Sequence, residues 1–304
     1  MTNKTILVVV DPRANEHPAV ERAASLAEHM SAGLELFICD YDPNIAAGRV
    51  STVWIDQPAR EHLLSILQQK LETLAEPLRE RGLDVATSTS WDHPLVDGIV
   101  RKVAASKPWI VVKDTHHHSV LKRTILSNTD WGLIRDCPAP LYLVKPSDTV
   151  ANPNIYAAVD PTHLHDKPAQ LDRGIVDIAQ LLADGLQGTL HVVHSYAYPA
   201  ALAVPEAAPV AELAEAVEEE HRRAFTEFLA SYPIPTDNTH LIQGLPHETL
   251  PELTEGGGVD LIVMGAISRS GLDRVFVGNT AERVLDRLSC DLLIVKPEGF
   301  ASSE

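Results

Sequence analysis

Residues 261–297 read LIVMGAISRSGLDRVFVGNTAERVLDRLSCDLLIVKP, and this stretch decides the fold. Leu261–Met264 is a short apolar run that breaks at Gly265, and Leu292–Val295 is a second apolar run. Between the runs, apolar residues recur at the spacing of one helix face: Ala281, Val284, Leu285 and Leu288. The order of strand, loop, helix and strand is typical of a parallel sheet, whose strands are continuous apolar runs because helices cover both faces.

The loop before the predicted helix is the first candidate site. Gly265 stands at the carboxyl end of a strand, and Gly278–Asn279–Thr280 stands at the start of the helix. Ligands of open parallel sheets bind at the carboxyl ends of the strands, and a helix start attracts anions through its free N–H groups and its dipole. These residues predict a nucleotide-phosphate site. The plainer alternative is that Gly265 makes a tight turn and Gly278 and Asn279 cap the helix.

These residues resemble a motif of the universal stress protein family. Its nucleotide-binding members carry Gly-x2-Gly-x9-Gly-(Ser/Thr), which falls here on Gly265, Ser268, Gly278 and Asn279. Two positions match, whereas Ser268 and Asn279 depart from the pattern and Thr280 follows one place late. The string GNTAE, followed by CDLL and VKP, is similar to the tandem two-domain members in particular. The resemblance implies an adenine nucleotide alpha hydrolase-like fold.

The sequence contains the same unit twice. The strand that ends in Asp11–Pro12 is echoed by the strand that ends in Asp160–Pro161, an offset of 160 − 11 = 149. SNTDWGLIRD from Ser127 maps onto GNTAERVLDR from Gly278, an offset of 278 − 127 = 151. Alternating strand and helix patterns in each copy predict an α/β protein with two tandem, doubly wound, five-stranded parallel-sheet domains.

We place the two domains at residues 1–147 and 155–304. The resemblance implies that the last strands of the two domains, Leu141–Val144 and Leu292–Val295, lie side by side, so that the domains form a pseudo-dimer.

The first copy departs further from the motif. Its residues at the three glycine positions are Asp114, His117 and Ser127. A carboxylate at Asp114 would repel a phosphate, and the β-carbon of Ser127 would crowd it. We therefore predict that the first domain has lost nucleotide binding and that its histidines fill the vacated site.

Two aspartates and a run of histidines complete the candidates. In the family an aspartate after the first strand contacts adenine, so the resemblance gives this role to Asp160, whereas a simple Asp–Pro turn is the alternative and is favoured for Asp11. His116–His118 invite a metal site, but consecutive residues point in different directions and no cysteine or glutamate has ligand spacing. We therefore name no metal-binding residue, and the question of whether these histidines bind a metal ion stays open.

The composition of the chain limits the classes of partner that we expect. The chain has 304 residues, 45% of them hydrophobic, and a net charge of −17, so nucleic acid and anionic membranes are not expected as partners. No apolar run approaches the length of a membrane span. The three cysteines share no CxxC, which favours a reducing compartment, and we expect a cytoplasmic protein.

Two hypotheses for function remain. The first is a stress-response regulatory protein that acts by binding, with an unknown partner and with a weak preference for a homodimer. The second is an adenine-nucleotide-binding module with slow ATPase activity, in which ATP or ADP is held only by the second domain. The sequence contains no GxSxG, HExxH or Walker A motif, so we name no catalytic residue and do not expect an enzyme.

Overall fold

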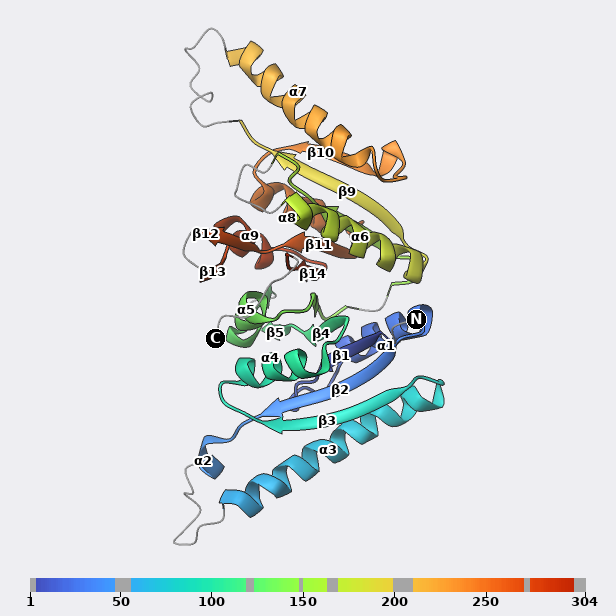
Figure 1. Ribbon diagram of the computed structural model, residues 1–304, viewed down its shortest axis with the longest axis vertical. Helices are drawn as coiled ribbons and strands as arrows, with labels where there is room; N and C mark the ends of the chain where they lie inside the picture. Colours follow the sequence, from blue (N-terminus) through green and yellow to red (C-terminus); the bar gives the residue numbers. More distant parts are fainter. Residues whose placement is uncertain are drawn as a thin grey trace. The chain divides into compact units, whose positions relative to one another are not determined.

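The computed structural model describes residues 4–46, 56–118, 123–147, 150–162, 169–198, 210–270 and 274–297. The chain divides into two compact units between residues 149 and 150. Each unit is an α/β domain built on a parallel sheet (Figure 1). Along the ranges described, no helix combines the length and the apolar composition that crossing a bilayer needs.

The sheet of the first unit has the strand order β7-β4-β1-β2-β3, and all of its pairings are parallel. Its central strands are continuous apolar runs that are buried because helices cover both faces. The strands are β1 (Thr5–Val9), β2 (Gly33–Asp40), β3 (Val85–Trp91), β4 (Ile110–Asp114) and β7 (Leu141–Val144).

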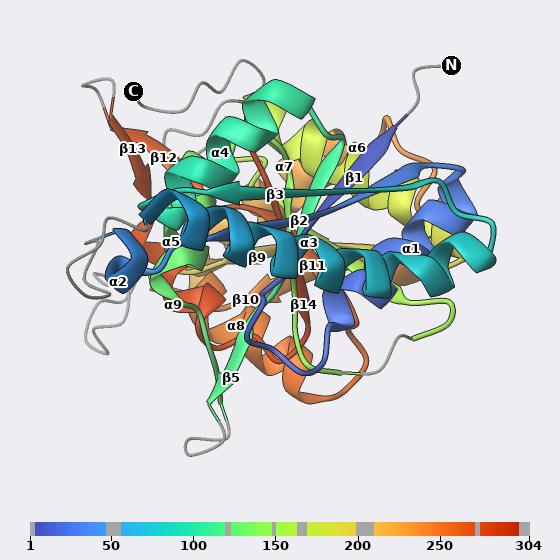
Figure 2. The ribbon, with the colours of Figure 1, turned by 90° about the horizontal axis from the view of Figure 1, so that it is seen from below.

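The longer helices of the first unit lie on opposite faces of its sheet, and the short α2 contacts α3. They are α1 (Pro18–Met30), α2 (Pro43–Ala46), α3 (Asp56–Glu80), α4 (Leu95–Ser106) and α5 (Asn128–Asp136). Right-handed crossovers put α1 and α3 on one face and put α4 and α5, which contact each other, on the other. Figure 2 shows α3 and α4 on opposite sides of β3.

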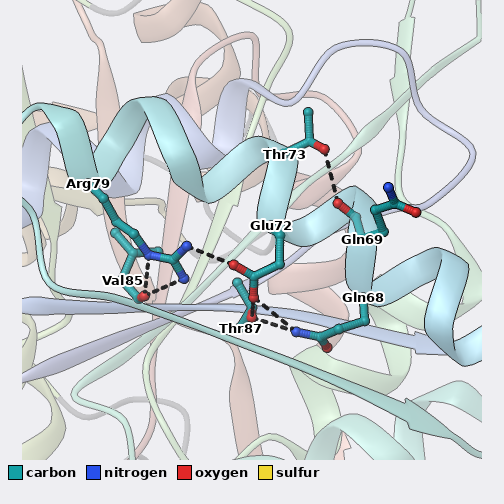
Figure 3. Close-up of polar contacts among 7 residues, drawn as sticks. All are labelled: Gln68, Gln69, Glu72, Thr73, Arg79, Val85 and Thr87. Atoms are coloured by element: carbon teal, nitrogen blue, oxygen red, sulfur yellow. Dashed lines mark hydrogen bonds and ion pairs between the residues drawn. The ribbon is translucent and has the colours of Figure 1, made fainter.

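A polar cluster attaches α3 to the edge strand β3. The carboxylate of Glu72 accepts hydrogen bonds from Thr87 on β3, from Gln68 at 3.1 Å and from Arg79 at 2.7 Å (Figure 3). The hydrogen bonds from Thr87 and Arg79 lower the pKa of Glu72 because they stabilise its charged form. Arg79 also donates to the carbonyl oxygen of Val85 at 3.0 Å, so one side chain joins the helix to the strand backbone.

The second unit repeats this arrangement with the strand order β10-β9-β8-β11-β14. Its strands are β8 (Asn154–Ala158), β9 (Thr189–Tyr196), β10 (Thr239–Gln243), β11 (Leu261–Gly265) and β14 (Asp291–Val295). Its helices are α6 (Ala169–Leu186), α7 (Val210–Leu229), α8 (Pro246–Glu255) and α9 (Asn279–Leu285), with a 3-10 turn at Thr236–Asn238. The predicted fold class, with two doubly wound parallel sheets of five strands, is confirmed.

One feature of each unit differs from the sequence prediction. The segment after the fourth strand, which we expected to be a loop, forms an antiparallel hairpin in both units. The first unit pairs β5 (His116–His118) with β6 (Arg123–Ile125), and the second pairs β12 (Ile267–Ser270) with β13 (Arg274–Val277). The valine, isoleucine and phenylalanine residues of β6, β12 and β13 suit such pairing, but these short runs carry no long alternation that the sequence would reveal.

The packing of α4 generates a stability prediction. A β-carbon added at Gly98 would lie 2.6 Å from Cys39 Sγ and 2.6 Å from the β-carbon of Asp92. Gly98→Ala should therefore lower the free energy of unfolding by about 1–3 kcal/mol, as overpacking does. Gly256→Ala is the matched control because nothing lies within 4 Å of its β-carbon position and its φ is −72°. Urea unfolding that shows equal effects for the two variants would contradict this packing.

Candidate functional site

The sheet of the second unit reverses its winding direction between β8 and β11. The chain runs from β8 outward through β9 to β10, and then returns to place β11 and β14 on the other side of β8. The pairing of Val263 with Ala157 makes β8 and β11 parallel neighbours. Ligands of doubly wound sheets bind outside the carboxyl ends of the strands at such a point. This edge is therefore the candidate site of the second unit.

The fold brings two of the predicted glycines together at this edge. Gly265 is the last residue of β11, and Gly278 is the N-cap residue of α9. The backbone N–H of Gly278 donates to the carbonyl oxygen of Ala266 at 3.1 Å, so the hairpin between them returns the chain to the end of β11. Gly278 thus lies close to the end of β11, where Gly265 stands, and the role of both glycines in binding stays a prediction.

One of the other motif residues takes a place that the sequence did not reveal. Ser268 lies in β12, where it pairs with Phe276 of β13 instead of standing in a loop. Asn279 and Thr280 open α9, where the sequence predicted a helix start. The side chains of Ser268, Asn279 and Thr280 lie outside the part of the structure that is described.

Asp160 lies just beyond β8, the strand next to β11. Its Oδ1 accepts a hydrogen bond from the hydroxyl of Thr162 at 2.8 Å, and its backbone N–H donates to Asp172 Oδ1 at 3.2 Å. Asp172 belongs to the first turn of α6 and is fully buried. The position of Asp160 is therefore fixed by α6. In the first unit, Asp11 Oδ1 accepts from the N–H of Arg13 at 2.8 Å, so both aspartates also make a local turn contact.

In the first unit, the counterpart of Gly265 binds a helix of its own unit. Asp114 ends β4, and the offset 265 − 114 = 151 matches that of the repeat. Its Oδ1 accepts the backbone N–H of Ala19, in the first turn of α1, at 2.7 Å. A carboxylate at a helix start is stabilised by the N–H group and by the helix dipole. The anion position at the start of α1 is therefore held by the chain's own carboxylate.

A buried ion pair lies beside Asp114. Lys113 Nζ lies 2.8 Å from Asp130 Oδ1, and the two side chains are 7% and 0% exposed. The same ammonium group donates to the carbonyl oxygen of Asp114 at 2.8 Å. Asp130 also makes a capping box with Ser127, in which each side chain accepts the other's backbone N–H. The start of α5 is thus satisfied by its own residues.

The second unit has apolar residues at the positions of this ion pair. Lys113 corresponds to Met264 and Asp130 to Ala281, since 264 − 113 = 151 and 281 − 130 = 151. Both Met264 and Ala281 are buried. Lys113 and Asp130 were not among the residues predicted from the sequence, although Ser127 followed three residues later by Asp130 is a readable capping signal. The position of Lys113 in an apolar strand does not indicate that Asp130 is its partner.

The histidines singled out from the sequence lie on β5. His116, His117 and His118 pair with β6, and their side chains lie outside the described part of the structure. Among the side chains that the structure describes, no group of three or more His, Cys, Asp or Glu is arranged to hold a metal ion. Metal binding by these three histidines therefore stays an open question.

Known proteins match the chain over nearly its whole length. The profile of the universal stress protein family matches residues 2–145 and 157–296. The chain is 28% identical to universal stress protein E of Photorhabdus laumondii, and the match covers 98% of this chain and 96% of that one. The protein of that name from Escherichia coli K12 is 27% identical, with 98% and 95% covered.

Two crystal structures resemble this protein along both units. A functionally unknown protein of Pseudomonas aeruginosa PAO1 has a TM-score of 0.77 and 28% identity, with 98% of this chain and 94% of that chain covered. A universal stress protein from Archaeoglobus fulgidus has a TM-score of 0.64 and 17% identity, with 97% and 99% covered, and this likeness concerns the fold alone.

The contrast between the units generates a test of the buried ion pair. Lys113→Met alone should lower the free energy of unfolding by about 3–5 kcal/mol, because Asp130 is left as an uncompensated buried charge. Adding Asp130→Ala gives the first unit the residues of the second unit, and the double variant should lose only about 1 kcal/mol, the value of a helix cap. Denaturant unfolding measures both. A double variant that is less stable than Lys113→Met would refute the ion-pair argument.

Proposed function

Because this chain belongs to the universal stress protein family, we propose that it is a stress-response regulatory protein that acts by binding rather than by turnover. One observation carries the proposal. The same edge of two related sheets is filled by the chain's own charges in the first unit, but carries Gly265, Gly278 and Asp160 in the second. Glycines, backbone N–H groups and one carboxylate are groups that hold a ligand.

We propose the second unit as the ligand-binding half. Its edge has no counterpart of the Asp114 carboxylate, since Gly265 stands there, and Met264 and Ala281 replace the buried ion pair. In the first unit, a phosphate would meet Asp114, which already occupies the N–H group of Ala19. Placing a second anion there would cost several kcal/mol, on the order expected for like charges a few ångströms apart.

The second candidate function is an adenine-nucleotide-binding module with slow ATPase activity in the same unit. The resemblance of Gly265 and Gly278 to the family motif favours ATP or ADP as the ligand, with Asp160 at the adenine. Ser268 and Asn279, which replace a glycine and a Ser/Thr, favour weak affinity. A cytoplasmic location, an unknown regulatory partner, a pseudo-dimer of the two domains and a homodimer of the chain all stay predictions.

Calorimetry with ATP on the full chain tests the site. Asp160→Asn should weaken binding about tenfold, because it removes one charge-assisted hydrogen bond worth roughly 1.5 kcal/mol. Asp11→Asn is the matched control, since Asp11 makes the equivalent turn in the first unit, and it should leave binding unchanged. Gly278→Val should abolish binding, because a branched side chain would stand where the proposed phosphate approaches the start of α9.

Each outcome has a definite consequence. Equal weakening by Asp160→Asn and Asp11→Asn would contradict the assignment to the second unit. Steady phosphate release that disappears in Gly278→Val would favour the ATPase hypothesis over binding without turnover. If the wild-type chain binds no ATP, the nucleotide hypothesis falls, and mass spectrometry of small molecules released from the purified protein then identifies or excludes another ligand.

A further inference from the structure

Helix α7 is held on the sheet of the second unit by few buried side chains. Among the residues of α7 whose side chains are described, 212–229, only His221 and Phe225 are buried. Helix α3, which occupies the same place in the first unit, buries four apolar residues at helical spacing: Leu67, Leu71, Ala75 and Leu78. The packing of α7 on its sheet therefore depends on a buried histidine, whereas the packing of α3 depends on apolar side chains.

His221 meets a second buried histidine on the sheet. Its Nδ1 lies 2.8 Å from Nε2 of His194, which belongs to β9 and is 1% exposed. Phe225 packs on His194 with ring centroids 5.8 Å apart, and Tyr196 stacks on His221 at 5.2 Å. Phe225 and His221 thus both contact His194, and His221 also contacts Tyr196, which lies two residues further along β9.

The hydrogen bonds fix the protonation state of this pair. Nδ1 of His194 lies 3.1 Å from the carbonyl oxygen of Val159, which can only accept, so Nδ1 carries the hydrogen. Nε2 of neutral His194 then accepts from the Nδ1–H of His221. One proton added at His221 Nε2 keeps both bonds but buries a charge. A second, at His194 Nε2, removes the acceptor and sets two positive charges side by side.

Burial affects the pKa of each histidine in the pair more strongly than the nearby carboxylates do. Burial is the largest effect on both histidines and lowers the pKa of His194 and of His221, although nearby carboxylates act in the opposite direction. The titratable groups that face the pair or its aromatic neighbour come from the end of β8, from α6, from the end of β9 and from α7, and they are Asp160, Asp172, Tyr196, Tyr198, Glu218 and Glu220.

We infer that the His194–His221 contact is a proton-sensitive latch that fastens α7 to the sheet of the second unit and releases it in mild acid. A freed imidazole takes up a proton near pH 6.5, whereas the latched one does so only at lower pH. Each proton taken up on release therefore raises the opening equilibrium constant up to tenfold per pH unit below 6.5. Release would uncover Phe225 and Tyr196, so acid would change the surface that the second unit presents. The latch does not depend on nucleotide binding.

Hydrogen exchange of the full chain between pH 7.5 and 5.5 tests the latch. After correction for the intrinsic pH dependence of exchange, protection of α7 amides should fall steeply below pH 6.5, by up to a hundredfold per pH unit for two protons. Protection of α6, which buries several apolar residues on the same face, should stay nearly constant. Constant protection of α7 over this range would overturn the proposal.

Two variants separate the latch from a general effect of acid. His221→Asn keeps an amide N–H where Nδ1 stands but does not titrate, so the response of α7 should fall to at most tenfold per pH unit. His240→Gln is the matched control. His240 pairs with His191 at 3.0 Å on the opposite face of β9, and its loss should leave the response of α7 unchanged.

A full response in His221→Asn, or an equal loss of response in His240→Gln, would overturn the latch. If His221→Asn does not fold, an NMR titration of the imidazole rings of the wild-type chain decides the question. The latch requires midpoints below 6.5 for His194 and His221, and a midpoint at or above 6.5 for both would refute it.

Discussion

A parallel sheet brings the carboxyl ends of its strands to one edge, and a buried charge at that edge must find a partner. The two units share the edge but meet this constraint differently. In the first, Asp114 binds the start of α1 and Lys113 pairs with the fully buried Asp130. In the second, the corresponding residues are glycine, methionine and alanine, which bring no charge to be satisfied. The charges at the first edge are satisfied by the chain's own residues, whereas we propose that the second edge binds a ligand.

The second unit is also the half with the less firmly attached helix. Its α7 buries a histidine and a phenylalanine where α3 of the first unit buries four apolar side chains and adds the polar cluster around Glu72. Burial of apolar area is the dominant stabilising term in folding, and it does not respond to pH. Replacing part of it by a histidine pair makes the attachment of α7 depend on protons. The first unit thus satisfies its charges internally, whereas we propose that the second unit carries the groups that respond to ligand and to pH.

The sequence revealed the fold because its strongest signals are local. Apolar runs, helical spacing and an offset of 149 to 151 residues predicted two parallel sheets, with Gly265 at a strand end and Gly278 at a helix start. It did not reveal the Lys113–Asp130 pair or the His194–His221 pair, whose members lie 17 and 27 residues apart and come together only when helix packs on sheet. Long-range side-chain partners leave no periodic trace, and neither do hairpins as short as β12–β13.

Photolabelling of the full chain with a photoreactive adenine nucleotide, followed by peptide mapping, tests the difference between the two edges most directly. We expect labelled peptides only from the second unit, near Asp160, Gly265 or Gly278, with labelling competed away by ATP. We also expect that Asp114→Gly combined with Lys113→Met and Asp130→Ala makes the first unit more accessible to label. Competable labelling of the wild-type first unit near Asp114, at the level of the second unit or above it, would contradict the proposed difference between the two edges.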